Sequence, residues 1–181
     1  MKRLFGRKPN IVLVGFMGTG KTSVGRRLAA QLRMRYVDTD DIIERDSGRR
    51  ISNIFSEDGE SAFRDLESEA VCKASKLYNY VIATGGGAVL RETNMEALKQ
   101  NGIIFCLTAT PDEIYRRVRH QSHRPLLQTP EPLAKIRSML AERKPYYAEA
   151  DYMVRTTGRP FREIIGYIKK VYAQKTKGSK R

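Results

Sequence analysis

The chain has 181 residues, of which 40% are hydrophobic and 30% are charged, and its formal net charge is +14. This size and composition are typical of one globular domain with its own core, and no apolar run approaches the length of a membrane span. The basic N-terminal residues lack the apolar segment of a secretory signal, so we expect a cytoplasmic protein with no membrane partner.

The positive charge is concentrated at the two ends of the chain. Residues 1–10 and residues 174–181 each carry four basic and no acidic side chains, so the ends hold more than half of the net charge. We predict basic tails over residues 1–9 and 174–181, outside the folded domain. Such tails can bind polyanions weakly, but solvated ends are the favoured interpretation, and we expect no specific nucleic acid partner.

Apolar runs and helix-favouring segments alternate along the chain, which predicts a parallel sheet with helices on both faces. The expected strands are residues 11–14, 35–37, 80–83, 103–107 and 152–155. The expected helices are residues 23–32, 41–46, 51–55, 61–76, 94–100, 111–119, 133–149 and 162–173, with Pro145 able to bend the seventh. Residues 120–132 are polar and punctuated by prolines, which indicates an exposed loop.

Cysteine and histidine give no sign of a metal centre. Cys72 and Cys106 lie in apolar stretches without partners at metal-ligand spacing, so we expect buried free thiols. His120 and His123 flank the polar loop and are expected to be exposed to solvent.

The first strand leads into a phosphate-binding pattern, G-x-x-x-x-G-K-[ST], over residues 15–22. Its backbone N–H groups and the start of the next helix would bind phosphate oxygens. Lys21 would reach the β- and γ-phosphates, and the Thr22 hydroxyl would bind Mg²⁺. A chance match in a glycine-rich turn is the alternative, which the flanking strand and helix disfavour.

Two further strands end in residues suited to chemistry. Residues 38–40, Asp-Thr-Asp, follow the second strand, and a glycine triple at residues 85–87 follows the third. Because ligands of open parallel sheets bind at the carboxyl ends of strands, all three segments should surround one crevice. If the chain stays extended, Asp38 and Asp40 point to the same side; Asp40 could instead cap the next helix. The glycines would let backbone approach a ligand, or form only a flexible turn.

Four arginines lie near these segments in the predicted order of elements. They are Arg64, Arg117, Arg124 and Arg143. A guanidinium can bind a carboxylate through two hydrogen bonds or neutralise a phosphate. In a chain this basic, a surface position remains the alternative for any one of them.

Together these residues resemble the shikimate kinase family, and the resemblance covers about residues 10–171. The matching patterns are G-F-M-G-T-G-K-T at 15–22, D-T-D at 38–40, F-R with E at 63, 64 and 67, A-T-G-G-G at 83–87, R-P-L-L at 124–127, and Arg143 with Tyr146. The resemblance implies transfer of the γ-phosphate of ATP to the 3-hydroxyl of shikimate, with Mg²⁺, in aromatic amino acid biosynthesis. It also implies a monomer with a three-layer α/β/α fold of the P-loop type, similar to nucleoside monophosphate kinases, with sheet order 2-3-1-4-5. One kinase domain would span residues 10–173, with a substrate-binding subdomain at about 38–67 and a lid at about 118–130.

Site roles follow from the same resemblance. Lys21, Asp40 and Arg124 would be catalytic, with Asp40 as base or orienting group. The implied nucleotide-binding residues are Gly18, Thr19, Gly20, Lys21, Thr22, Ser23, Arg117, Arg124 and Arg159. The implied substrate-binding residues are Asp40, Arg64, Gly85, Gly86, Gly87 and Arg143. Thr22, and Asp38 through water, would hold the metal.

Two alternatives remain open on the sequence. One is another kinase of this fold, acting on gluconate or a nucleotide. The other is an ATP-binding regulatory or nucleic-acid-binding protein without catalysis, which the presence of Lys21, Asp40 and Arg124 disfavours.

Overall fold

The computed structural model describes residues 8–119 and 129–178. Its strands are β1 (Asn10–Val14), β2 (Arg35–Asp38), β3 (Tyr80–Ala83), β4 (Gly102–Thr108) and β5 (Tyr152–Arg155). Its helices are α1 (Lys21–Leu32), α2 (Thr39–Ser47), α3 (Ile51–Glu57), α4 (Gly59–Ser75), α5 (Glu92–Asn101), α6 (Pro111–Val118), α7 (Pro132–Tyr147) and α8 (Phe161–Gly178), with a short 3-10 helix η1 (Ala88–Leu90).

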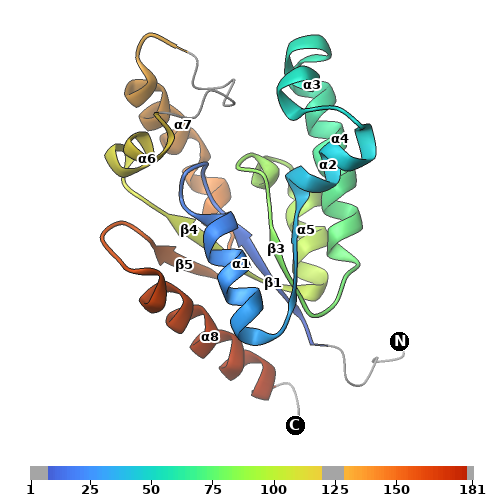
Figure 1. Cartoon of the computed structure of the whole chain (residues 1–181), viewed down its shortest axis with the longest axis vertical. Helices are drawn as coiled ribbons and strands as arrows, with labels where there is room; N and C mark the ends of the chain where they lie inside the picture. The colour runs from blue at the N-terminus through green and yellow to red at the C-terminus, as the bar shows by residue number, and fades with distance from the viewer. Residues whose placement is uncertain (1–7, 120–128, 179–181) are drawn as a thin grey trace.

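The strands form a parallel sheet in the order β2-β3-β1-β4-β5, so the predicted fold class and strand order are confirmed (Figure 1). The central strand β1 pairs with β3 on one side and β4 on the other, with Val12 opposite both Ile82 and Ile104. All three strands are apolar runs, as expected for strands that are buried on both faces.

Alternate residues of β1 face two separate cores. Ile11 and Leu13 are fully buried against α1 and α8, in a cluster that includes Leu28 and Ile168. Val12 and Val14 belong to the larger cluster on the other face, built mainly from helices α2 to α7. The period of two along a strand therefore divides the helices into two layers around the sheet.

The second helix differs from its prediction in where it begins. α2 starts at Thr39, with Asp38 as its N-cap, and the Oδ1 atom of Asp38 accepts a hydrogen bond from the Asp40 backbone N–H at 3.2 Å. Asp38 is the last extended residue of β2, whereas Thr39 and Asp40 are already helical, so the residue that caps the helix is Asp38 rather than Asp40. Both are aspartates, which N-cap positions prefer, so the sequence alone gave no means of choosing between them.

The C-terminal helix is longer than predicted. α8 continues to Gly178, so residues 174–178 are helical and do not belong to a tail. Lysine is a good helix former, and Lys175 and Lys177 lie in the last turn, where the helix dipole favours positive charge. The residues predicted as an N-terminal tail lie, apart from Lys8 and Pro9, outside the described part of the chain.

Two smaller predictions also need correction or refinement. Cys106 is buried in β4 as expected, but Cys72 is exposed on α4. Pro145 lies within α7 without ending it, since the helix continues to Tyr147.

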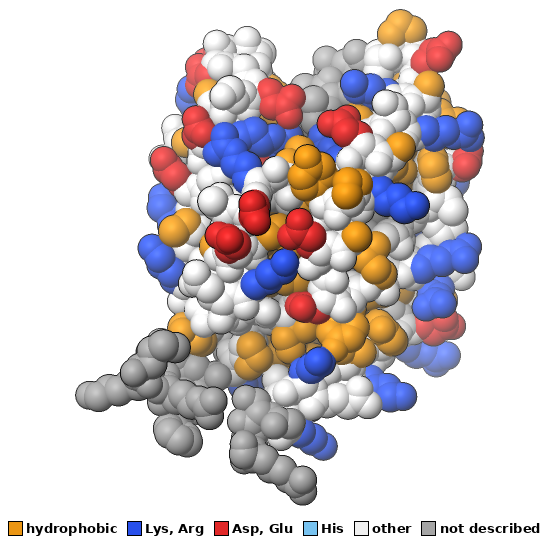
Figure 2. Space-filling view, turned by 180° about the vertical axis from the view of Figure 1, so that it is seen from behind, with side chains coloured by type: hydrophobic (Ala, Val, Ile, Leu, Met, Phe, Trp, Pro, Cys, Tyr) orange, Lys and Arg blue, Asp and Glu red, His pale blue; other side chains and the backbone are white. Residues whose placement is uncertain are grey.

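Figure 2 shows the face turned away from the viewer of Figure 1, where basic and acidic side chains are interspersed with scattered hydrophobic groups. In the two described segments, no helix is both long enough and apolar enough to span a bilayer.

Candidate active site

The phosphate loop connects the end of β1 to the first residue of α1. Gly20, the N-cap of α1, has a φ of 98°, and Gly18 has a φ of 74°, a left-handed backbone that favours glycine. Lys21 folds back over the loop, and its Nζ donates hydrogen bonds to the carbonyl oxygens of Gly15, at 2.7 Å, and Phe16, at 3.0 Å. The ammonium is thus held at the start of α1, where a phosphate would bind.

The carboxylate of Asp38 lies beside this loop and accepts three hydrogen bonds. Its Oδ1 atom accepts from the Asp40 backbone N–H; its Oδ2 atom accepts from the Thr22 hydroxyl at 3.2 Å and from the Tyr36 hydroxyl at 3.0 Å. Burial, together with the charge of Asp38, raises the pKa of Tyr36 above its ordinary value. Tyr36 belongs to none of the sequence motifs, and the structure adds it to the site through this contact with Asp38.

The Thr22 hydroxyl and the Asp38 carboxylate are suitable oxygen ligands for Mg²⁺. Magnesium prefers oxygen ligands and is commonly held by one or two carboxylates together with waters and substrate phosphates. Among the described residues there is no group of three histidine, cysteine or acidic side chains that could enclose a metal by itself. One hydroxyl and one carboxylate beside a phosphate loop therefore fit a magnesium ion that accompanies a nucleotide.

The glycine triple after β3 packs directly against charged side chains. A Cβ atom at Gly85 would lie 3.0 Å from Oδ1 of Asp40 and would collide with Glu67. A Cβ atom at Gly87 would lie 2.6 Å from Nη2 of Arg64. Close approach to a ligand or a flexible turn was predicted for these glycines, and Gly85 and Gly87 in addition make room for three charged groups of the site.

Arg64 and Glu67, one turn apart on α4, form a buried ion pair. The Nη1 atom of Arg64 lies 2.7 Å from Oε2 of Glu67, and the two side chains are 10% and 1% exposed. Arg64 also donates to Oε1 of Glu60 at 2.7 Å. Burial raises the pKa of the Glu67 carboxyl, while Arg64 and Arg143 oppose that shift. Glu67 belongs to the family pattern without a predicted role of its own, and its spacing of three residues from Arg64 on a helix is the sequence feature that indicates the pair.

Arg143 projects from α7 toward the same glycine turn after β3. It is buried, its guanidinium lies 5.7 Å from the centre of the Phe16 ring, and its Nη1 atom is 3.5 Å from the carbonyl oxygen of Gly86. The Tyr147 hydroxyl donates to the same carbonyl at 2.7 Å. Within the described residues, Nε of Arg143 and Oε1 of Glu67 are buried without a hydrogen-bond partner. Buried polar atoms of this kind indicate a place where a ligand or water binds.

A cleft of about 630 Å³ extends from the loop toward α6 and α8. Its lining includes the loop from Met17 to Ser23, both aspartates, and Arg117 and Arg159. Arg117 donates to the carbonyl oxygen of Gly18 at 3.0 Å and to Glu113 at 2.7 Å, which links α6 to the loop. Residues of this lining outside the predicted site include Val24, Glu113, Arg116, Phe161 and Ile164.

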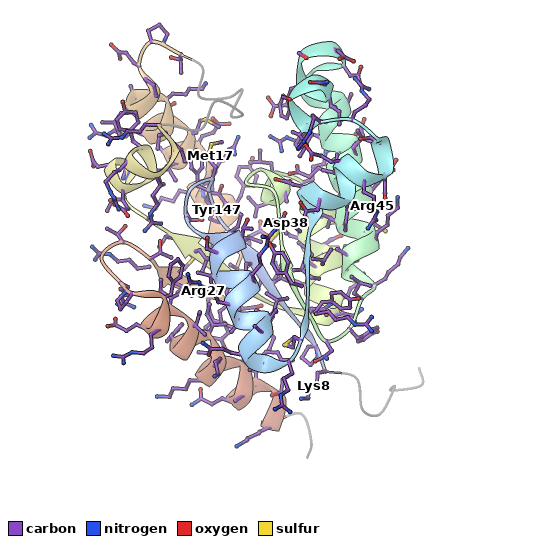
Figure 3. All side chains as sticks on the ribbon, viewed as in Figure 1. Lys8, Met17, Arg27, Asp38, Arg45 and Tyr147 are labelled. Atoms are coloured by element: carbon purple, nitrogen blue, oxygen red, sulfur yellow. The ribbon has the colours of Figure 1, made fainter. Side chains whose placement is uncertain are left out.

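The predicted site residues that fall within the described segments thus come together at one end of the sheet. Figure 3 shows Met17, Asp38 and Tyr147 at this end, whereas Lys8 lies at the opposite end. Arg124, most of the predicted lid, His120 and His123 lie outside the described residues.

Comparisons with known proteins agree with this geometry. The family model described as shikimate kinase matches residues 17–173. The chain belongs to the shikimate kinase family. A shikimate kinase of Thermodesulfovibrio yellowstonii is 46% identical over 169 residues, which are 93% of this chain and 98% of that relative.

Solved structures support the same assignment to the shikimate kinases. The structure of shikimate kinase from Acinetobacter baumannii in complex with shikimate has a TM-score of 0.89 and 38% identity, and covers 93% of this chain and 94% of that one. A gluconokinase from Sinorhizobium meliloti, with a TM-score of 0.59 and 15% identity, covers 95% of this chain and 96% of that one and shares the fold alone. The predicted family, fold and enzyme class, an ATP-dependent kinase, are therefore confirmed.

Proposed function

We propose that the protein transfers the γ-phosphate of ATP to the 3-hydroxyl of shikimate, and that the residues described above bind the two substrates. The hydroxyl oxygen bonds to the γ-phosphorus, the bond from that phosphorus to the bridging oxygen breaks, and ADP leaves. The proton of the hydroxyl is lost in the same reaction. Such transfers depend mainly on positioning and on neutralisation of charge.

The observation that carries the proposal is the pair of buried guanidinium groups beside the glycine turn. Arg64 contacts Gly87, and Arg143 contacts Gly86, so both cations lie at one short segment of backbone. Burial of two positive charges near each other is unfavourable unless anions compensate them. Glu67 compensates Arg64, and the carboxylate of shikimate would compensate the second charge.

Asp40 lies between this anion site and the phosphate loop. It lines the cleft together with Lys21 and Thr22, and it also approaches Gly85. A carboxylate in that position would accept a hydrogen bond from the attacking hydroxyl and orient its oxygen toward the γ-phosphate.

On the donor side, the loop N–H groups and Lys21 would bind the phosphates of ATP, and Arg117 and Arg159 would flank the nucleotide in the cleft. Mg²⁺, held by Thr22 and through water by Asp38, would neutralise phosphate charge. Arg124 is proposed to contact the transferring phosphate.

We further propose that the enzyme is a cytoplasmic monomer. Both cysteines are free, which suits a reducing compartment. Its exposed large hydrophobic residues in the described segments are distributed over three elements, with Tyr146 on α7, Met153 on β5, and Phe161 and Tyr167 on α8. Light scattering after size-exclusion chromatography would test the monomer.

A coupled ADP-release assay with shikimate, gluconate and AMP as acceptors tests the activity. Turnover with shikimate alone is expected, and turnover with another acceptor but not with shikimate would refute the proposal. The methyl ester of shikimate tests the anion site, because it lacks the carboxylate charge. The wild type should bind the ester more weakly than it binds shikimate. Arg64→Ala should weaken the binding of shikimate by roughly 2–5 kcal/mol and should reduce the difference in affinity between shikimate and its ester.

A further inference from the structure

Of the three described donors to Asp38, the Tyr36 hydroxyl is the one side-chain donor that lies outside the proposed catalytic machinery. Tyr36 and Asp38 are two residues apart on β2, so their side chains share one face of the strand. The hydroxyl donates to Oδ2 of Asp38 at 3.0 Å. The other two donors are the Thr22 hydroxyl, which belongs to the phosphate loop, and the Asp40 backbone N–H.

The ring of Tyr36 is held firmly by α1. A Cβ atom at Gly25 would lie 2.7 Å from Cε2 of Tyr36, so the absence of a side chain at Gly25 lets the ring rest against the helix. The guanidinium of Arg26 lies 5.6 Å from the centre of the ring. The phenol is therefore a fixed donor from the sheet, unlike the hydroxyl of a mobile surface residue.

The number of hydrogen bonds that the Asp38 carboxylate can accept shows what the Tyr36 hydroxyl contributes. A carboxylate has about four acceptor sites, and the three described hydrogen bonds to Asp38 occupy three of them. One site remains for a water bound to a metal ion. Without the Tyr36 hydroxyl a second site opens on Oδ2, which bulk water would fill, and the carboxylate loses a constraint on its rotation.

We propose that Tyr36 is a positioning residue that orients the Asp38 carboxylate toward the hydrated Mg²⁺ of the bound nucleotide. The inference rests on the proposed function, because that function supplies the magnesium nucleotide. Groups that hydrogen-bond to metal-binding carboxylates commonly tune metal affinity in this way.

Tyr36→Phe tests the proposal, because it removes the hydroxyl and keeps the ring that packs on Gly25. Tyr80→Phe is the matched control: it removes a tyrosine hydroxyl from the neighbouring strand β3, where that hydroxyl contacts Arg35 at the surface. Calorimetry would measure ADP affinity with Mg²⁺ and, separately, with EDTA. The ADP-release assay would give the Mg²⁺ concentration for half-maximal activation, and thermal unfolding would report stability.

For Tyr36→Phe we expect about a 10- to 100-fold loss of ADP affinity in Mg²⁺, the range typical for removal of a group that orients a metal-binding carboxylate, and a similar rise in the Mg²⁺ requirement. ADP affinity in EDTA should be unchanged, as should every value for Tyr80→Phe. Equal losses with Mg²⁺ and EDTA, or lower stability with an unaltered Mg²⁺ requirement, would overturn the proposal. The calorimetric comparison is independent of the acceptor, so it remains decisive even if wild-type enzyme fails to phosphorylate shikimate.

Discussion

Replacing Gly87 by alanine should weaken shikimate binding selectively, by displacing Arg64. Gly87 has φ −102° and ψ −1°, a conformation open to alanine, so the substitution causes no backbone strain of its own. Its effect comes from the new Cβ atom, which would collide with Nη1 of Arg64 and would lie 2.5 Å from Cζ and 2.6 Å from Nη2. A comfortable contact needs about 3.5 Å, so the guanidinium must move by more than about 1 Å.

Arg64 cannot make that movement without cost. Glu67 and Glu60 anchor it at 2.7 Å each, and Glu67 is fully buried. A displaced guanidinium either strains these bonds or loses one of its hydrogen bonds to the substrate carboxylate. One hydrogen bond to a charged group contributes about 1.5–3 kcal/mol, which corresponds to about a 10- to 150-fold rise in the dissociation constant for shikimate.

Calorimetry with shikimate and with ADP separates the two halves of the site. Gly87→Ala should weaken the binding of shikimate by the factor given above. Its affinity for ADP should stay within about twofold of the wild-type value. Gly166→Ala is the control, because a Cβ atom there would have no neighbour within 4 Å on the exposed side of α8. Unchanged shikimate affinity in a folded Gly87→Ala protein would refute the reasoning, since it would mean that Arg64 does not contact the substrate.

Three further predictions concern catalysis, pH and the C-terminus. Asp40→Asn should lower kcat by about 10²- to 10⁴-fold in the ADP-release assay while calorimetry gives normal ADP binding, and near-normal turnover would remove its assigned role. Arg116 and Arg117 lower the pKa of Glu113 to about 2, against 4.5 in the unfolded chain. The free energy of unfolding of the wild type should therefore exceed that of Glu113→Gln by its full amount above about pH 5, and this difference should decline as the pH falls toward 2. Chemical denaturation at several pH values measures the difference, and a difference that does not change with pH would contradict the prediction. Deleting residues 174–181 should leave kcat and both KM values unchanged, because the described residues of this segment lie beyond the site, and a large loss of activity would show that the end of α8 supports it.

The sheet could be predicted closely because its strands are short apolar runs with distinct boundaries. Residues 80–83 and 152–155 match β3 and β5 as predicted. Helix ends were harder, since they depend on which of several suitable residues makes the capping bond. Asp38 and Asp40 were equally suitable as caps, and only the path of the chain after β2 selected Asp38.

The site residues that the sequence missed act on other side chains. Tyr36 and Glu67 have no motif of their own, and each is identified by its contact with a residue that has one, Asp38 or Arg64. The spacings, two along a strand and three along a helix, are visible in the sequence. They became informative only when burial showed that Glu67 is 1% exposed and the hydrogen bonds showed where Tyr36 points.

The strand order explains why the two halves of the site meet without a separate scaffold. β3 lies between β2 and β1, so the glycine turn after β3 is flanked by Asp38 on one side and by the phosphate loop on the other. A Cβ atom at Gly86 would lie 3.2 Å from the backbone nitrogen of Met17, so the turn and the loop are in main-chain contact. The distance between donor and acceptor is thus set by the rigid sheet, whereas affinity for the acceptor depends on Arg64 and Arg143, which project from α4 and α7. Substitutions on those helices should change binding of the acceptor before they change the geometry of transfer.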